Sequence, residues 1–135
     1  MKIDKIPFAD KTAVFERASS MHDCDFTVTL EGDTLIFTFE DLDRYCDDEP
    51  WFPEHKKLTA KFLHVGSLCL SLSRGRKEKD YFDTVEPLKD AELTMYTYSV
   101  DFEDNMTLEF HVLMKKKLWH GEISIRPREI EYIWE

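Results

Sequence analysis

The stretch that decides the fold runs from Asp25 to Glu40 and reads DFTVTLEGDTLIFTFE. Apolar residues alternate with polar ones on both sides of Gly32, with Phe26, Val28 and Leu30 before it and Leu35, Phe37 and Phe39 after it. Successive side chains of a strand point to opposite faces, so this period of two predicts two strands with one buried face each. Glycine readily adopts the positive φ that a tight hairpin turn requires. We therefore predict a β-hairpin formed by residues 25–30 and 35–40.

The same alternation recurs along the chain. It is unbroken in residues 67–73 and 106–112, and it predicts further strands at 58–64, 91–100, 119–125 and 129–134, with turns at 101–105 and 115–117. The side chains expected to be buried are Leu35, Phe37, Phe39, Leu68, Leu70, Leu72, Leu108, Phe110 and Val112.

Residues 8–21 differ from the rest of the chain. Asp10 can cap a helix, and Val14, Ala18 and Met21 share one helical face. The sequence thus predicts an all-β protein, an antiparallel sandwich or barrel of about eight strands with one short N-terminal helix. The 135 residues are the length of a single domain, 1–135.

The composition of the chain indicates its cellular location and whether it needs a cofactor. No apolar run approaches membrane-spanning length, and the first residues lead into no apolar signal-peptide core, so we expect a cytoplasmic protein without membrane contact. The three cysteines, Cys24, Cys46 and Cys69, are odd in number and irregularly spaced, which favours reduced thiols over disulfides or a zinc site. We expect no cofactor and no bound metal, and therefore a melting temperature that chelators leave unchanged.

Charge is distributed unevenly. The chain carries a net charge of −10, and residues 21–55 alone reach −10, with eleven acidic residues and one basic residue, Arg44. Overall acidity argues against binding nucleic acid, whose phosphates need a basic face. It suits a basic partner, because opposite fields steer encounter.

Four groups of residues contain side-chain types that bind ligands or act in catalysis. His22, Asp23, Cys24 and Asp25 are all metal-ligating types, but neighbours on a strand point apart, so a turn that launches the strand is the preferred interpretation, with Asp23 bonding backbone amides. Residues 41–52 lack the glycine and glutamate spacing of a calcium-binding loop, and we interpret 41–54 as a solvated loop. Residues 73–79 lack a phosphate-loop pattern and fit a charged hairpin tip. The scattered histidines accompany no nucleophile motif, and Trp119-His120-Gly121 is interpreted as packing and a bend, so no catalytic, cofactor-binding or metal residue is assigned.

Met21-His22-Asp23, followed by an alternating strand, a Gly-Asp turn and a second strand, resembles small uncharacterised bacterial all-β proteins, some of them immunity-protein-like. The resemblance covers about residues 21–40, and more loosely the β-rich remainder. It implies an interaction protein rather than an enzyme. It carries no functional residues across to this chain.

The predicted function is a non-catalytic protein-binding module, in its sharpest form an immunity-type protein against a basic toxin. The predicted partner-binding residues are Asp41, Asp43, Asp47, Asp48 and Glu49. Two alternatives stay open, a carrier of a small apolar ligand inside a β-barrel and an enzyme without a recognisable motif. Aromatic residues also make a homodimer an option, through Tyr96 and Tyr98 or through Trp119 and Trp134.

Overall fold

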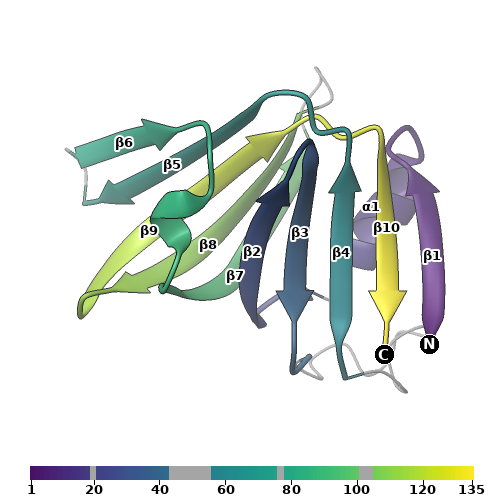
Figure 1. Cartoon of the computed structure of the whole chain (residues 1–135), viewed down its shortest axis with the longest axis horizontal. Helices are drawn as coiled ribbons and strands as arrows, with labels where there is room; N and C mark the ends of the chain where they lie inside the picture. Colours follow the sequence, from purple (N-terminus) through teal and green to yellow (C-terminus); the bar gives the residue numbers. More distant parts are fainter. Residues whose placement is uncertain (19–20, 43–55, 76–77, 101–104) are drawn as a thin grey trace.

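The computed structural model describes residues 1–18, 21–42, 56–75, 78–100 and 105–135. More than half of these residues lie in strands, and the described residues form ten strands and one short α-helix, α1. Figure 1 shows their arrangement. The elements in chain order are β1 (Lys2–Pro7), α1 (Lys11–Ala18), β2 (Asp25–Glu31), β3 (Thr34–Phe39), β4 (Leu58–Leu63), β5 (Leu68–Arg74), β6 (Glu78–Phe82), the 3-10 turn η3 (Glu86–Leu88), β7 (Glu92–Val100), β8 (Met106–Met114), β9 (Lys117–Ile125) and β10 (Glu129–Trp134).

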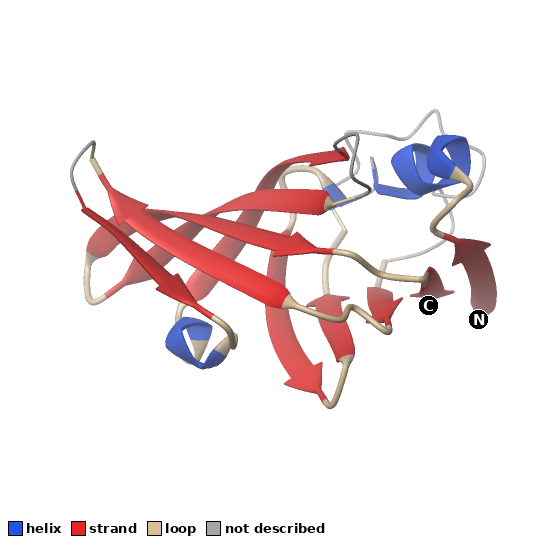
Figure 2. Cartoon of the chain, turned by 90° about the horizontal axis from the view of Figure 1, so that it is seen from above, coloured by secondary structure: helices blue, strands red, loops and turns tan. Residues whose placement is uncertain are grey.

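The strands form one antiparallel sheet in the order β1-β10-β4-β3-β2-β7-β8-β9-β5-β6. β2 joins two halves of this sheet, because it pairs with β3 from Thr27 to Glu31 but with β7 only at Asp25 and Phe26. Figure 2 shows the two halves turned strongly against each other. β1 and β6 end the sheet and do not pair with each other, so the fold is sandwich-like and not a closed barrel. The predicted all-β antiparallel class with one short N-terminal helix is confirmed.

The two halves share a core that Phe26 connects. Its ring centroid lies 5.3 Å from that of Phe37 in β3 and 5.4 Å from that of Phe110 in β8, both in edge-to-face geometry. Helix α1 lies behind β1 and β10 in Figure 1, and its buried residues Val14 and Ala18 belong to the same core. All nine side chains predicted to be buried are buried, which confirms the alternation from which they were predicted.

Two strands escaped prediction, and both are edge strands. β1 reads KIDKIP and β6 reads EKDYF, so neither has a clean period of two. Charged residues and proline on an edge strand prevent pairing with other chains. They also interrupt the alternation of apolar and polar residues from which a strand is predicted.

The predicted turns are mostly confirmed. Lys115 and Lys116 adopt positive φ angles between β8 and β9, and Arg74 pairs with Glu78 across the basic hairpin tip of β5 and β6. The predicted turn at 101–105 and the loop at 41–54 lie largely outside the described residues. Within the described ranges, no helix has the length and apolar character needed to cross a membrane.

Candidate functional site

A cleft of about 660 Å³ lies on the surface at the start of β2 and the end of β3, and we call it the acidic cleft. Antiparallel pairing places these two ends together, because Thr27 lies opposite Thr38. The described residues that line it include four carboxylates and no basic side chain: Asp23, Cys24, Asp25, Phe26, Thr27, Thr38, Glu40, Asp41 and Leu42.

The floor of the acidic cleft belongs to the core, since Cys24, Phe26 and Leu42 are buried. Backbone hydrogen bonds fix the entry to β2: the amide of Asp23 donates to the carbonyl of Met95, and the amide of Met95 donates to the carbonyl of Cys24, each at 3.0 Å. A rigid base with charged groups around it is a typical arrangement for binding.

The acidic side chains of the cleft are held to different degrees. Asp25 accepts a 2.7 Å hydrogen bond from the Thr94 hydroxyl, and Lys57 Nζ lies 3.7 Å from a carboxylate oxygen of Glu40.

The predicted turn at 22–25 is confirmed. The Asp23 carboxylate, however, lies 3.1 Å from His22 Nδ1, and among the described residues it accepts no hydrogen bond from a backbone amide.

The predicted partner-binding residues divide into two groups. Asp41 lines the acidic cleft, whereas Asp43, Asp47, Asp48 and Glu49 lie outside the described residues. The prediction omitted Asp23, Asp25 and Glu40. They were within reach of sequence reasoning, because the hairpin register brings positions 25 and 40 to the same end and all three lie in the acidic segment 21–55.

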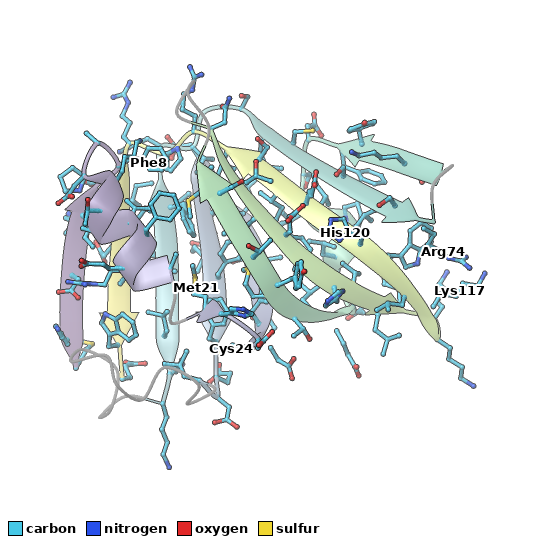
Figure 3. The ribbon with its side chains drawn as sticks, turned by 180° about the vertical axis from the view of Figure 1, so that it is seen from behind. Phe8, Met21, Cys24, Arg74, Lys117 and His120 are labelled. Atoms are coloured by element: carbon cyan, nitrogen blue, oxygen red, sulfur yellow. The ribbon has the colours of Figure 1, made fainter. Side chains whose placement is uncertain are left out.

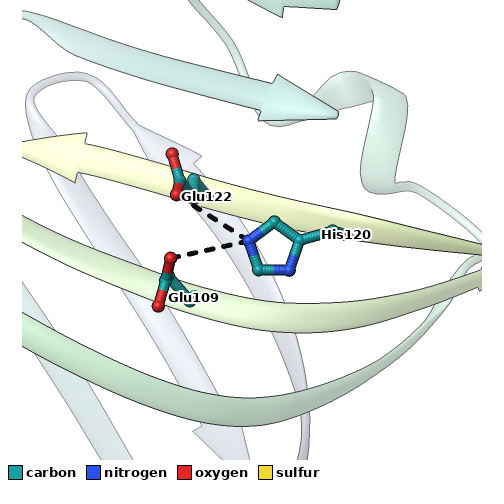
Figure 4. A group of neighbouring side chains, drawn as sticks. All are labelled: Glu109, His120 and Glu122. Atoms are coloured by element: carbon teal, nitrogen blue, oxygen red, sulfur yellow. Dashed lines mark ion pairs between the residues drawn. The ribbon is translucent and has the colours of Figure 1, made fainter. Parts of the chain in front are cut away.

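A second group of polar side chains lies on the outer face of β8 and β9, and Figure 4 shows its members, Glu109, His120 and Glu122. His120 Nε2 lies 3.6 Å from Glu109 Oε1 and 3.7 Å from Glu122 Oε1. One ligand atom from each residue lies within 4.8 Å of the others. In the part of the chain that the structure describes, this Glu–His–Glu cluster is the group able to hold a metal ion.

The register of β8 and β9 builds the Glu–His–Glu cluster. Glu109 lies directly opposite Glu122, and His111 lies opposite His120. Ser71 of β5, which is buried, lies opposite Glu122 on the other side and donates a 3.5 Å hydrogen bond to its carboxylate. Two acids and two histidines thus share one patch of the sheet.

Burial raises the pKa of Glu109, and the neighbouring Glu122 raises it further through a side-chain hydrogen bond and its charge, while His120 acts in the opposite direction. Like charges directly opposite each other on paired strands destabilise a sheet. The pair therefore favours a shared proton or a bound cation.

Neither Glu109 nor Glu122 was predicted as a site residue, and Trp119-His120-Gly121 was predicted to provide packing and a bend. The packing part is seen, because a Cβ atom on Gly121 would lie 2.4 Å from Phe110 Cε2. His120 itself faces outward, with 41% of its side chain exposed.

Of the aromatic residues proposed for self-association, Trp134 is fully buried and Tyr96 is 49% exposed. The expectation that Trp134 supplies surface is therefore wrong: it faces the core and stacks on Tyr132. Trp119 packs partly against the core, and the Tyr98 side chain lies outside the described set. Cys24 is buried and Cys69 is exposed, while Cys46 is outside the described residues.

Comparison of the chain with protein-family models, with curated proteins and with solved structures finds no match. The geometry of the chain itself is therefore the basis for the functional proposal.

Proposed function

We propose that the protein is a non-catalytic binding module whose partner is a basic protein, and that the acidic cleft receives lysine or arginine side chains of that partner. The observation that supports this most is the set of four carboxylates, from Asp23, Asp25, Glu40 and Asp41, which have no basic side chain beside them among the described residues of the lining. Inhibition of a basic toxin, as an immunity-type protein, is the sharpest form of the proposal.

The distribution of charge over the molecule supports the same proposal. Figure 3 shows Cys24, in the acidic cleft, far from the basic hairpin tips that carry Arg74 and Lys117. A molecule with separated charges orients an oppositely charged partner during encounter. After Leu42 the chain continues with Asp43, Asp47, Asp48 and Glu49, which we keep as further contacts on the basis of sequence.

The carrier alternative receives less support. Its barrel would need a closed sheet, and this sheet is open between β1 and β6. Large side chains such as Trp134, Tyr132, Phe37 and Phe62 occupy the interior and are fully buried. We keep a cytoplasmic location as a sequence-based expectation, which the odd number of cysteines favours.

The test is capture of partners from the source cell at low salt, followed by identification by mass spectrometry. The bait is the wild-type chain or a cleft variant carrying Asp23→Asn, Asp25→Asn, Glu40→Gln and Asp41→Asn. Each exposed charge pair contributes about 0.5 kcal/mol, so four lost pairs weaken binding by about 2 kcal/mol, or about thirtyfold. We expect a basic protein to be captured by the wild type, lost from the cleft variant and released by salt.

A matched control variant removes four acids that do not line the cleft, namely Asp83→Asn, Glu86→Gln, Asp90→Asn and Glu129→Gln. It has the same net charge as the cleft variant, so it separates a local site from general acidity. Equal capture by the cleft variant and the wild type would contradict the proposal. Equal loss with both variants would show that net charge, and not the cleft, selects the partner.

A further inference from the structure

We propose that the outer face of β8 and β9 binds one divalent transition-metal cation, such as Zn²⁺, through Glu109, His120 and Glu122. This proposal replaces the sequence-based expectation that the protein binds no metal. It is independent of the acidic cleft, which lies at the start of β2 and the end of β3.

The distances from the His120 imidazole to the two carboxylates fit a metal ion. Zinc is bound by imidazole nitrogen and carboxylate oxygen at about 2.1 Å, and tetrahedral geometry then places ligand atoms about 3.4 Å apart. The observed distances from His120 Nε2 are 3.6 Å to Glu109 and 3.7 Å to Glu122. Side-chain shifts of a few tenths of an ångström would close this difference.

The charge of the cluster calls for a cation. Among the described residues, His120 is the basic side chain that pairs with Glu109 or Glu122, and no lysine or arginine pairs with either acid. Neutral imidazole leaves two carboxylates facing each other across paired strands. Imidazole together with carboxylate favours zinc and similar metals over magnesium or calcium, which prefer oxygen ligands alone.

The strands hold the ligands in place before any metal arrives. β8 and β9 pair continuously from Met106 opposite Ile125 to Met114 opposite Lys117, and Ser71 holds the Glu122 carboxylate. Sites built on strands with hydrogen-bonded ligands keep their geometry better than sites on loops.

The site is accessible from solvent. The three side chains are 30% to 41% exposed, and His120 also lines a shallow depression of about 250 Å³ with Ser73, Arg74 and His111. A metal site requires an entry path, and here a cation can reach the ligands without any opening of the fold.

A protonated His120 that pairs with both acids would give the same distances without a metal. The two interpretations differ in what happens when zinc is added at neutral pH. The test is isothermal titration calorimetry of the tag-free, EDTA-treated and dialysed full chain with Zn²⁺. We expect binding of one zinc ion per chain.

Three variants, Glu109→Gln, His120→Gln and Glu122→Gln, should each weaken zinc binding by about tenfold or more, because each removes a ligand. The control variant is His64→Gln, which removes a different histidine–carboxylate pair, His64 with Asp33 at 3.0 Å. It should leave the zinc affinity unchanged.

NMR spectra of the histidine rings provide a second measurement. It uses the wild-type chain, so its result does not depend on whether a variant folds. Zinc should shift the His120 ring resonances before those of His22 or His64. Absence of zinc binding by the wild type, unchanged affinity in the two glutamate variants, or shifts confined to His22 or His64 would overturn the proposal.

Discussion

Replacement of Gly121 by alanine tests how tightly the ring of Phe110 is packed in the core. A Cβ atom at this position would lie 2.4 Å from Cε2 of Phe110 and 2.9 Å from its Cδ2 and Cζ atoms. Ordinary contacts between carbon atoms are about 3.5 to 4.0 Å, so the ring must move by about 1 Å. Phe110 is fully buried and packs edge-to-face on Phe26, which leaves the ring little room.

Overpacking of this kind costs about 1 to 3 kcal/mol, and the smaller conformational entropy of unfolded alanine returns up to about 1 kcal/mol. We therefore expect Gly121→Ala to lower the free energy of unfolding by about 1 to 2 kcal/mol. The melting temperature should fall by about 4 °C per kcal/mol for a chain of this size. Urea unfolding followed by circular dichroism measures the change.

Phe110→Leu supplies the control, because leucine lacks the Cε2 and Cζ atoms that the new methyl group would meet. In the Phe110→Leu background, Gly121→Ala should cost about 1 kcal/mol less than it does in the wild type. An alanine variant as stable as the wild type, or an equal cost in both backgrounds, would refute the packing argument.

The remaining predictions concern the core, the acid pair and the thiols. Phe37→Ala should lower the free energy of unfolding by about 3 to 5 kcal/mol in urea, because the ring is fully buried. Burial and Glu122 raise the pKa of Glu109, so the folded state binds this proton more tightly than the unfolded chain does, and stability is lost as pH rises through the raised value. In metal-free protein, Glu109→Gln should therefore be more stable than the wild type at neutral pH, with the difference vanishing in acid; urea titrations in EDTA at the two pH values measure this. A thiol reagent should label Cys69 in the folded protein and Cys24 only after unfolding, as peptide mapping will show.

Sequence predicted the strands that have one buried face and missed the two that do not. The alternation around Phe37 and Phe110 indicated both the strands and their inward faces, because burial on one side imposes a period of two. β1 and β6 lie at the edges, where charge is favoured over alternation. The sequence could not predict that β2 joins the two halves of the sheet. Its short pairing with β7 links strands that are far apart in the sequence, and no turn connects them directly.

The candidate sites were predictable only where a turn fixed the register. The turn at Lys115 and Lys116 places Glu109 opposite Glu122, so the acid pair could have been predicted by counting equal distances from that turn. The acidic segment was recognised by composition. The pairing of β2 with β3 determines which acidic residues line the cleft. This pairing brings Asp25 and Glu40 next to Asp41, which had been predicted.

The most direct test of the proposed function is an NMR footprint of the captured basic partner on the isotope-labelled chain. The proposal predicts that backbone amide resonances of the cleft, within residues 23–27 and 38–42, shift or broaden most and recover when salt is raised. Changes confined to the outer face of β8 and β9, or to the surroundings of η3, with the cleft resonances unmoved, would contradict it.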